Sequence, residues 1–300
     1  MTKVVSFWGK GGVGKTTCAA SVAVKLASRG FHTLLISSDP TPSLSDILEI
    51  SHCPSITKVQ STPLYVLELS EDNVVGMWKQ KYGEEVYQVI SAFLPVDKSI
   101  IDYIAGAPGI ADEFCLSYIM ELQKQEVYDY IVWDTAPAGG TLKLLKLEEQ
   151  FYKHLTEAAK LYLSIKTVLR KIRRKEEANP LKILDSWKRL AEDTLAMLSS
   201  SLFKAHIVAI PEWLSVAQTE RLVNELLAFK VNIGKVVVNQ VVLDAPDHLG
   251  KKIIHQKYLS MLKEKLSFLD IITVPLQTYE IRGMDNLLAF SEHLVDKLEL

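Results

Sequence analysis

The sequence has few cysteines, no Cys-x-x-Cys pair and no apolar run of membrane-spanning length. Its three cysteines, Cys18, Cys53 and Cys115, are odd in number and widely separated, so they imply no disulfide framework. No apolar run approaches the roughly 18–20 residues that cross a bilayer. The N-terminal segment lacks the apolar core and small-residue cleavage site of a signal peptide. These absences predict a cytoplasmic protein with reduced thiols that does not itself span a membrane.

An excess of charge of one sign is also missing. The formal net charge is −2, whereas a protein built mainly to hold nucleic acid usually carries a strong basic excess. We therefore expect no nucleic-acid partner. Hydrophobic residues make up 48% of the chain and charged residues 23%, which is a globular balance. A chain of 300 residues can form one large α/β domain, with or without an insertion.

Apolar segments of strand length alternate with helical patterns along the chain. Several of these segments are continuous and β-branched, which is typical of parallel strands covered on both faces. Because helical patterns lie between them, they predict an α/β fold with a doubly wound, mostly parallel sheet. The expected strands span residues 3–8, 33–38, 64–69, 130–134, 206–210, 235–242 and 271–274.

Two stretches break this alternation and predict a helical subdomain inserted within a single domain of residues 1–300. The subdomain is expected at approximately residues 73–125 and 147–202. Apolar residues recur there at helical spacing. In the first stretch they are Val75, Trp78, Tyr82, Val86, Val89 and Phe93, and in the second they include Phe151, Leu155, Tyr162, Leu169, Leu184 and Leu195. Two interpretations remain open: these stripes pack on one another, or they line an apolar groove for a client helix.

The strongest motif is a glycine-rich loop between the first expected strand and a helix. Glycines let successive backbone N–H groups curl around phosphate oxygens, and the helix N-terminus adds a favourable dipole. Lys15 is expected to reach the β- and γ-phosphates, Thr16 to ligate Mg²⁺ and Thr17 to contact the α-phosphate. The motif therefore predicts a P-loop NTPase that uses ATP and Mg²⁺. Its residues are Gly9, Lys10, Gly11, Gly12, Val13, Gly14, Lys15, Thr16 and Thr17.

Three charged residues complete the expected catalytic site. Lys10 would add positive charge where the transition state of phosphoryl transfer gathers negative charge, beside Lys15. Asp134 and Asp39 each end an expected strand at the carboxyl edge of the sheet, where ligands of such sheets bind. We expect Asp134 to hold Mg²⁺, directly or through water, and Asp39 to position the attacking water. Either aspartate alone could be an ordinary strand-end residue.

Taken together, the motifs resemble those of one family, the arsenite-pump ATPases (ArsA) and the ATPases that target tail-anchored membrane proteins. The loop sequence K-G-G-V-G-K-T-T is similar to the family's deviant Walker A motif. The resemblance extends in order over nearly the whole chain. The segments that carry it are residues 10–17, 38–46, 107–113, 134–142, 210–215, 218–222, 238–240 and 275–283.

The resemblance implies roles that the residues alone do not. It implies that Lys10 reaches across a dimer interface to the partner's nucleotide, and that Asp39 belongs to switch I. Residues 134–140 would form switch II, Asn239 would bind the adenine, and the segment after Pro275 would close over the base. It further implies an ATP-hydrolysing homodimer that forms with nucleotide, holds a client transmembrane helix in an apolar groove and delivers it to a membrane receptor.

The sequence also departs from the family pattern. Switch I reads Asp39-Pro40-Thr41-Pro42-Ser43 and lacks the family's histidine, and switch II has Ala138 and Gly140 where the family usually has threonine and histidine. Because Asp39 is present, we still expect hydrolysis. No cysteine lies between residues 239 and 259, so the family's shared zinc ion is not expected.

Two other functions remain as alternatives. The chain could be the energising ATPase subunit of an arsenite or anion transporter, for which three cysteines would form a trigonal thiol site. It could also be a positioning ATPase of the MinD/ParA type. That function predicts a basic or amphipathic anchor, whereas the helix expected at residues 285–300 is acidic.

Overall fold

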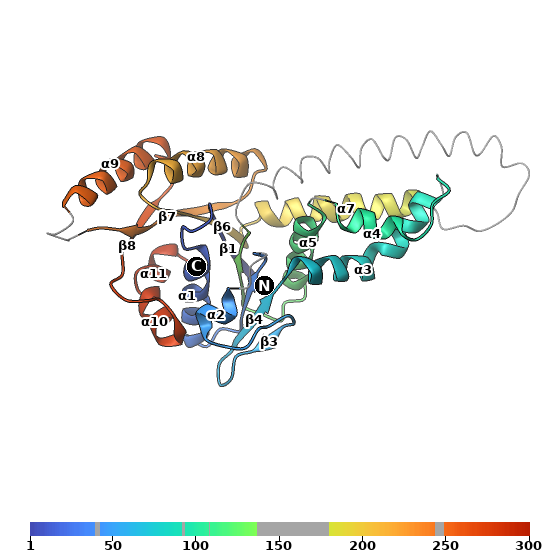
Figure 1. Cartoon of the computed structure of the whole chain (residues 1–300), viewed down its shortest axis with the longest axis horizontal. Helices are drawn as coiled ribbons and strands as arrows, with labels where there is room; N and C mark the ends of the chain where they lie inside the picture. Colours follow the sequence, from blue (N-terminus) through green and yellow to red (C-terminus); the bar gives the residue numbers. More distant parts are fainter. Residues whose placement is uncertain (40–42, 92–93, 108, 137–179, 244–248) are drawn as a thin grey trace, which may run out of the picture. The chain divides into compact units, whose positions relative to one another are not determined.

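The chain forms two compact units (Figure 1). The computed structural model describes residues 1–39, 43–91, 94–107, 109–136, 180–243 and 249–300. The first unit contains Met1–Ser70, Met120–Gly139 and Met197–Leu300, and it includes every described strand. The second contains Glu71–Ile119 and Gly140–Ala196, and its described part is helical. Much of the second stretch of the expected subdomain lies outside the described residues.

An eight-stranded sheet forms the centre of the first unit, in the order β3-β4-β2-β5-β1-β6-β7-β8. All neighbouring strands are parallel except β3 and β4. The prediction of a doubly wound, mostly parallel sheet is therefore confirmed. The strands are β1 (Lys3–Trp8), β2 (Thr33–Ser37), β3 (Thr57–Lys58), β4 (Leu64–Glu68), β5 (Tyr130–Asp134), β6 (Phe203–Ala209), β7 (Ile233–Val241) and β8 (Ile271–Pro275).

Seven of these strands match the predicted ones, and their ends differ by three residues at most. The prediction missed β3, because a strand of two exposed residues shows no detectable period. The largest shift is in β6, which begins at Phe203 rather than His206. An apolar sequence pattern defines short edge strands and strand ends least well.

Helices cover both faces of the sheet (Figure 1). One face carries α1 (Lys15–Ser28) and α10 (Gly283–Ser291), and the other carries α8 (Trp213–Ala228) and α9 (Leu249–Lys265). No helix in the described ranges is both long and apolar enough to cross a membrane. The remaining helices are α2 (Leu44–Leu48), α3 (Glu71–Ser91), α4 (Ile100–Ala105), α5 (Ile110–Lys124), α7 (Pro180–Ser199) and α11 (Val295–Leu298).

Two details of the helices correct the sequence expectations. In α3 the buried residue is Val74 rather than Val75, because the apolar face continues through Trp78, Val86 and Val89. The helix expected at residues 285–300 is divided into α10 and α11 by a turn at residues 292–294. Backbone bonds from i to i−3, such as Leu294 N to Ser291 O at 3.0 Å, tighten the chain there. The turn keeps Leu294 fully buried in the core.

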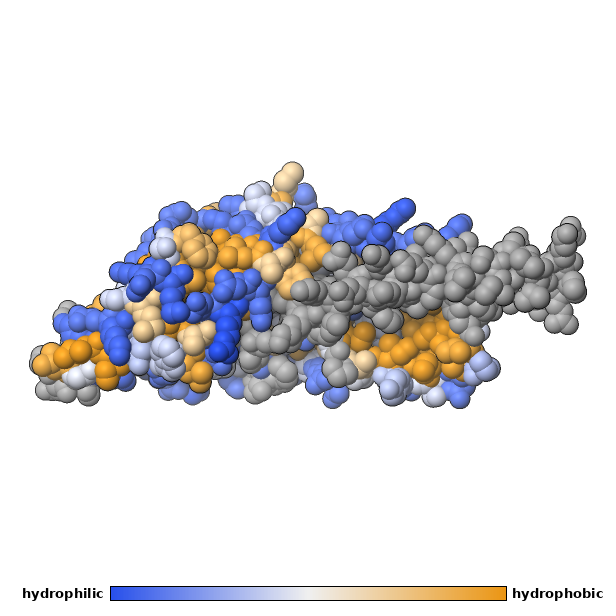
Figure 2. All heavy atoms as spheres, turned by 90° about the horizontal axis from the view of Figure 1, so that it is seen from above, coloured by the Kyte–Doolittle hydropathy of each residue, from blue (hydrophilic) through white to orange (hydrophobic). Residues whose placement is uncertain are grey.

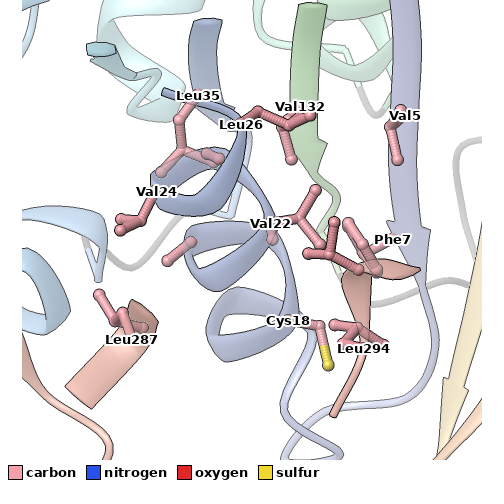
Figure 3. Close-up of a cluster of buried hydrophobic side chains, with 14 of the residues drawn as sticks. Val5, Phe7, Cys18, Val22, Val24, Leu26, Leu35, Val132, Leu287 and Leu294 are labelled. Carbon is pink, nitrogen blue, oxygen red and sulfur yellow. The ribbon is translucent and has the colours of Figure 1, made fainter. Parts of the chain in front are cut away.

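The P-loop helix α1 is the centre of the main hydrophobic core. Ten of its fourteen residues are buried, so it packs against the sheet and the C-terminal helices at once. Figure 3 shows Val22 and Leu26 of α1 in one cluster with Val132 of β5, which Leu287 and Leu294 also join. Small alanines along α1 permit this close approach. The site at the start of α1 is therefore built on one of the most enclosed helices of the first unit.

A buried histidine on β6 contacts the backbone of the neighbouring strand β7. His206 on β6 is fully buried, and its Nδ1 accepts a hydrogen bond of 3.0 Å from the Lys235 backbone N–H. Among the described residues its Nε2 has no partner. Burial, together with the charge of Lys204, lowers the pKa of His206 to about 3. A Cβ at Gly234 would lie 2.5 Å from His206 Cε1, and the β6–β7 register shifts at this point.

Gly234→Ala tests whether this close approach limits stability. We expect the substitution to lower the free energy of unfolding by about 2 kcal/mol, because the added methyl group overlaps a fully buried ring. Thermal or urea unfolding measures the change. The control is Gly250→Ala, where an added Cβ would meet no atom within 4 Å. Equal free energies of unfolding for the two variants would show that β7 moves away from the His206 ring at no energetic cost, which would contradict this prediction.

Candidate nucleotide site

The site is built on one row of residues that crosses four neighbouring strands. Phe7 of β1 pairs with Asp134 of β5, Asp134 pairs with Ser37 of β2, and Ser37 pairs with Glu68 of β4. All four strands are parallel, so their carboxyl ends meet at this edge of the sheet. The glycine-rich loop leaves the same edge after Trp8. Register alone therefore brings the predicted Asp134 and the loop together.

Glycine is required at both ends of the loop for steric reasons. A Cβ at Gly9 would lie 2.3 Å from the carbonyl oxygen of Val208. Gly14 directly precedes α1 with a φ of 94°, and a Cβ there would lie 2.4 Å from Nδ2 of Asn239. The loop thus passes between β6 and Asn239 with no space for side chains at either end. Its backbone N–H groups are close to the start of α1, which is the arrangement that binds phosphate.

Lys15 is the buried cation of the loop. Its side chain is 6% exposed, and its Nζ donates a hydrogen bond of 3.3 Å to the carbonyl oxygen of Lys10. Burial lowers the pKa of Lys15, and the nearby charges of Asp134 and Asp39 oppose that shift. Both predicted aspartates therefore act electrostatically on this lysine. A phosphate oxygen would be a stronger partner for this ammonium group than a neutral carbonyl oxygen.

Asp134 lies at the centre of the site and is fully buried. Its Oδ2 accepts hydrogen bonds from Thr16 Oγ1 at 2.7 Å and from Ser37 Oγ at 3.3 Å. Burial raises its pKa to about 6, the Thr16 bond and the Lys15 charge lower it, and the Asp39 charge raises it. The other oxygen, Oδ1, is buried and has no partner among the described residues. This carboxylate therefore has unused acceptor capacity beside a threonine hydroxyl.

These groups fit a magnesium ion. Mg²⁺ prefers hard oxygen ligands and usually keeps several waters, which need acceptors in the surrounding protein. A threonine hydroxyl can ligate the ion directly, and the unpartnered Oδ1 of Asp134 can accept a hydrogen bond from a metal-bound water. In the described ranges no group of three histidine, cysteine or acidic residues could hold a metal ion, so here the nucleotide phosphates and waters would have to complete the coordination.

Ser37 is a site residue that the motifs did not reveal. Its hydroxyl donates to Asp134, and it accepts a hydrogen bond of 3.2 Å from the Asp39 backbone N–H. One hydroxyl therefore connects the two predicted aspartates. The only sequence signal was a serine near the end of an apolar strand, one position in a Ser-Ser-Asp run. The pairing with Asp134 depends on strand register, which a single sequence does not give.

Lys10 lies at the surface beside the start of α8. Its Nζ is 3.7 Å from Oε2 of Glu212, the residue that precedes this helix. The lysine side chain is 23% exposed and that of the glutamate 61%, so the pair contributes little to stability. The family motif contained Glu212, but the sequence did not indicate its contact with Lys10. A weak, exposed ion pair leaves the lysine able to exchange partners.

Asn239 contacts the loop through its side-chain amide. Nδ2 donates to the Val13 carbonyl oxygen at 3.0 Å, and Oδ1 accepts from the Gln240 backbone N–H at 2.9 Å. The expectation from the sequence was a hydrogen bond to adenine, which remains a prediction. Pro275 ends β8, and the next residue, Leu276, donates its N–H to the Val241 carbonyl oxygen at 2.9 Å. Of the expected switch II, residues 137–140 lie outside the described residues.

The Asp134 carboxyl makes the stability of the metal-free protein depend on pH. The unfolded chain releases this proton near pH 4, whereas the folded chain keeps it to about pH 6. The folded state therefore binds more protons between these values, and the free energy of unfolding falls as the pH rises through this window. We expect Asp134→Asn, measured in chelator at pH 7.5, to raise the free energy of unfolding by about 2 kcal/mol.

This gain should shrink below pH 6 and disappear near pH 4. Chemical unfolding at several pH values provides the measurement. The exposed Glu264→Gln, which removes a carboxylate from the same unit, is the matched control and should leave stability unchanged. Equal stability of Asp134→Asn and the wild type at pH 7.5 would mean that burial does not penalise the ionised carboxylate.

Known proteins resemble this chain over almost its whole length. The sequence matches the ArsA ATPase family, described as anion-transporting ATPases, over residues 2–296. It is 30% identical to "ATPase ASNA1 homolog 1" of Paramecium tetraurelia, over 96% of this chain and 90% of that protein. It is 28% identical to "ATPase GET3" of Komagataella phaffii, over 96% and 88% of the two chains.

A bacterial relative matches to a similar degree. The chain is 29% identical to "Putative arsenical pump-driving ATPase 2" of Aquifex aeolicus, over 97% of this chain and 99% of that protein. The predicted resemblance is therefore confirmed. The family match covers the loop, both aspartates and the late segments alike, so the protein is an ATPase and belongs to the anion-transporting (ArsA) ATPase family.

Proposed function

We propose that this ATPase works as a nucleotide-gated homodimer that captures a client membrane-protein helix and targets it to a membrane receptor. The observation that carries the ATPase part is the buried Asp134, which has one oxygen bonded to Thr16 and the other without a partner among the described residues. The homodimer and the client helix go beyond this observation, and each has its own support and its own test. The membrane receptor is proposed from the resemblance to targeting ATPases.

Within the site, the bound nucleotide would be held by the loop. Backbone N–H groups of residues 9–14 surround the phosphates, Lys15 contacts the β- and γ-phosphates, and Thr17 contacts the α-phosphate. Thr16 ligates Mg²⁺ and Asp134 accepts from a metal-bound water. When bound, Mg²⁺ supplies a Lewis acid that neutralises charge developing on the phosphates. Asn239 and the segment after Pro275 are proposed to hold the adenine.

Asp39 is proposed to position the attacking water. Its backbone is held by Ser37, and its charge acts on both Lys15 and Asp134, so the carboxylate is close to the proposed phosphate site. A carboxylate there can accept a proton or a hydrogen bond from water in line with the terminal phosphate. Lys15 and Lys10 would stabilise the charge that gathers on the transferred phosphoryl group.

The surface around Lys10 is suited to contact with a partner subunit. Large apolar side chains are exposed near the starts of α8 and α9, where Trp213, Leu214, Leu249 and Ile253 are each more than half exposed. Figure 2 looks onto the side that carries these helices and shows apolar surface among charged side chains. These helices begin at the carboxyl edge of the sheet, where the loop also lies. A second copy would cover this apolar surface and bring its own Lys10 to the nucleotide.

Mixing two inactive variants tests whether Lys10 acts across the interface. Lys10→Ala removes the lysine from the partner's site, and Lys15→Gln disables the subunit's own site. A mixed dimer would have one complete site, because the Lys10→Ala subunit keeps Lys15 and receives Lys10 from its partner. We expect the equimolar mixture to recover roughly a quarter of wild-type ATPase activity, since half of randomly formed dimers are mixed.

The control is Lys10→Ala mixed with the double variant Lys10→Ala, Lys15→Gln, which provides no lysine in trans and should stay inactive. If the first mixture is as inactive as this control, Lys10 acts within its own subunit and the proposed dimer site is wrong. Phosphate release at several protein concentrations distinguishes the two results and shows whether activity depends on association.

The proposed client site lies in the helical unit. Its described helices include α3 and α4, and α3 buries Trp78, Val86 and Val89 on one face, so these side chains pack within the unit and do not themselves form an open groove. The expected groove residues Leu155, Tyr162 and Leu169 lie outside the described residues and stay a prediction. The relatives named ASNA1 and GET3 and the resemblance to targeting ATPases favour this function. A transmembrane helix is apolar on all sides, so it needs an apolar groove for transport through water.

Client capture by Asp39→Asn tests the targeting function. This variant should bind ATP and hydrolyse it slowly, and so hold a co-expressed protein that ends in a single transmembrane helix. We expect a soluble complex in gel filtration with ATP, which is lost when Leu155, Tyr162 and Leu169 are changed to Asp. Phe268→Asp, at an exposed aromatic residue of the first unit, is the control and should keep the complex. If nucleotide drives dimerisation but no complex forms, the targeting proposal fails for this client class.

The transporter function is the second candidate, and the name of the Aquifex relative favours it. A trigonal thiol site needs three ionisable cysteines, yet burial raises the pKa of both Cys18 and Cys115 to about 12. In the described structure Cys18, Cys53 and Cys115 are all buried, and they do not form a metal-binding group. Arsenite-stimulated ATPase activity that is lost in Cys→Ser variants would favour this candidate over targeting.

A further inference from the structure

A second buried carboxylate lies two strands away from Asp134. Glu68 ends β4 and is 2% exposed. Its Oε1 accepts hydrogen bonds from the backbone N–H groups of Leu44 and Ser45, at 3.0 Å each, and from Ser45 Oγ at 3.1 Å. Its Oε2 accepts from Cys53 N at 3.1 Å and lies 2.8 Å from His52 Nδ1. Five donors therefore converge on one side chain.

These bonds fix the first turn of α2, which follows the Asp39 segment. The first N–H groups of a helix have no partner within the helix, and Ser43, the residue before α2, makes no side-chain cap. Glu68 supplies the missing acceptor from a neighbouring strand. The short helix is therefore attached to the sheet at its N-terminal end.

Glu68, to which the start of α2 is attached, lies beside Ser37, where the chain leaves β2. Ser37 and Glu68 are paired residues on the adjacent strands β2 and β4, and Leu69 donates its N–H to the Ser37 carbonyl oxygen at 2.9 Å. The chain leaves β2 at Ser37, passes Asp39 and returns to Glu68 at Leu44. Ser37 holds the outgoing end through the Asp39 N–H, and Glu68 holds the returning end.

We propose that Glu68 is a positioning residue for ATP hydrolysis: by holding Leu44 and Ser45 at the start of α2, next to Ser37, it orients the Asp39 carboxylate at the terminal phosphate. The proposal rests on the proposed role of Asp39 and adds a residue that does not touch the nucleotide. Two fixed ends limit where Asp39 can lie, and a displacement of about 1 Å of a positioned group can cost on the order of 100-fold in rate.

The chemistry of the side chain explains why a carboxylate is needed. An ionised carboxylate only accepts hydrogen bonds, and its two oxygens offer about four lone-pair sites, which the five donors share. Burial by itself would raise the pKa of Glu68, but the bonds from Ser45, Cys53 and His52 hold the pKa below its usual value. Glutamine would direct an NH₂ group toward backbone N–H donors at one of the two positions, so it would lose either the Cys53 bond or the bonds from Leu44 and Ser45.

The experiment compares kcat with nucleotide affinity in Glu68→Gln. We expect kcat to fall by roughly tenfold or more, while the affinity for Mg·ADP stays within about threefold of wild type. The affinity for Mg·ADP should be unchanged, because the loop and α1 are proposed to bind ADP and the segment that contains Asp39 is not. The control is Glu264→Gln, which removes an exposed carboxylate from the same unit at a position outside the nucleotide site. Its kcat should stay within about twofold of wild type.

A double variant shows whether Glu68 acts through Asp39. In an Asp39→Asn background, Glu68→Gln should lower the residual kcat by no more than about twofold, because residues that act as a unit are not additive. A full additional loss of roughly tenfold would mean that Glu68 acts by another route and would overturn the proposal.

Other outcomes are equally decisive. If Glu68→Gln is less stable yet hydrolyses ATP at the wild-type rate where it is folded, Glu68 is only structural and this proposal fails while the proposed function stands. If Asp39→Asn hydrolyses ATP at the wild-type rate, the role of Asp39 and this proposal fail together. If Glu68→Gln does not fold, Ser45→Ala removes one of the five bonds and should lower kcat about twofold to fivefold at unchanged Mg·ADP affinity. A wild-type kcat in Ser45→Ala would then contradict the proposal.

Discussion

The burial of one carboxylate, that of Asp134, is the constraint on which the site depends. The carboxylate is fully buried, and burial raises its pKa. One of its oxygens accepts hydrogen bonds from Thr16 and Ser37, and the other has no partner among the described residues. Such a group is costly in the protein alone and becomes favourable when a cation and its waters arrive. Binding of a cation would therefore relieve this cost. Sheet register fixes the arrangement, because Asp134 lies directly between Phe7, next to the loop, and Ser37, next to Asp39.

The same edge of the sheet provides routes by which the nucleotide could act at a distance. On one side, the Ser37–Glu68 pair holds the segment that contains Asp39. On the other side, Lys10 forms a weak ion pair with Glu212 at the start of α8, beside exposed apolar side chains. A phosphate that attracts Lys10 would therefore change contacts at the surface as well as in the site. This link between chemistry and surface is what the proposed dimer and client capture require.

Much of this could be predicted from the sequence, because the signals were local. The loop motif, the strand-end Asp134 and seven of the eight strands follow from residue order and apolar pattern. What could not be predicted depends on strand register and on side-chain packing. Ser37 and Glu68 are ordinary residues near strand ends until β2, β4 and β5 are aligned. The contact of Gly234 with a buried histidine and the contact of Asn239 with the loop also join residues far apart in the sequence.

A crystal structure of the protein with Mg²⁺, ADP and aluminium fluoride is the most direct test of the central claim. The account predicts the ion about 2.1 Å from Thr16 Oγ1, with Asp134 Oδ1 accepting a hydrogen bond from a metal-bound water or ligating the ion directly. The Thr16 hydroxyl can keep its bond to Asp134, because it ligates the ion through a lone pair and still has an O–H to donate. An ion bound elsewhere, with Oδ1 still without a partner, would contradict the assignment of this buried carboxylate as the centre of the nucleotide site.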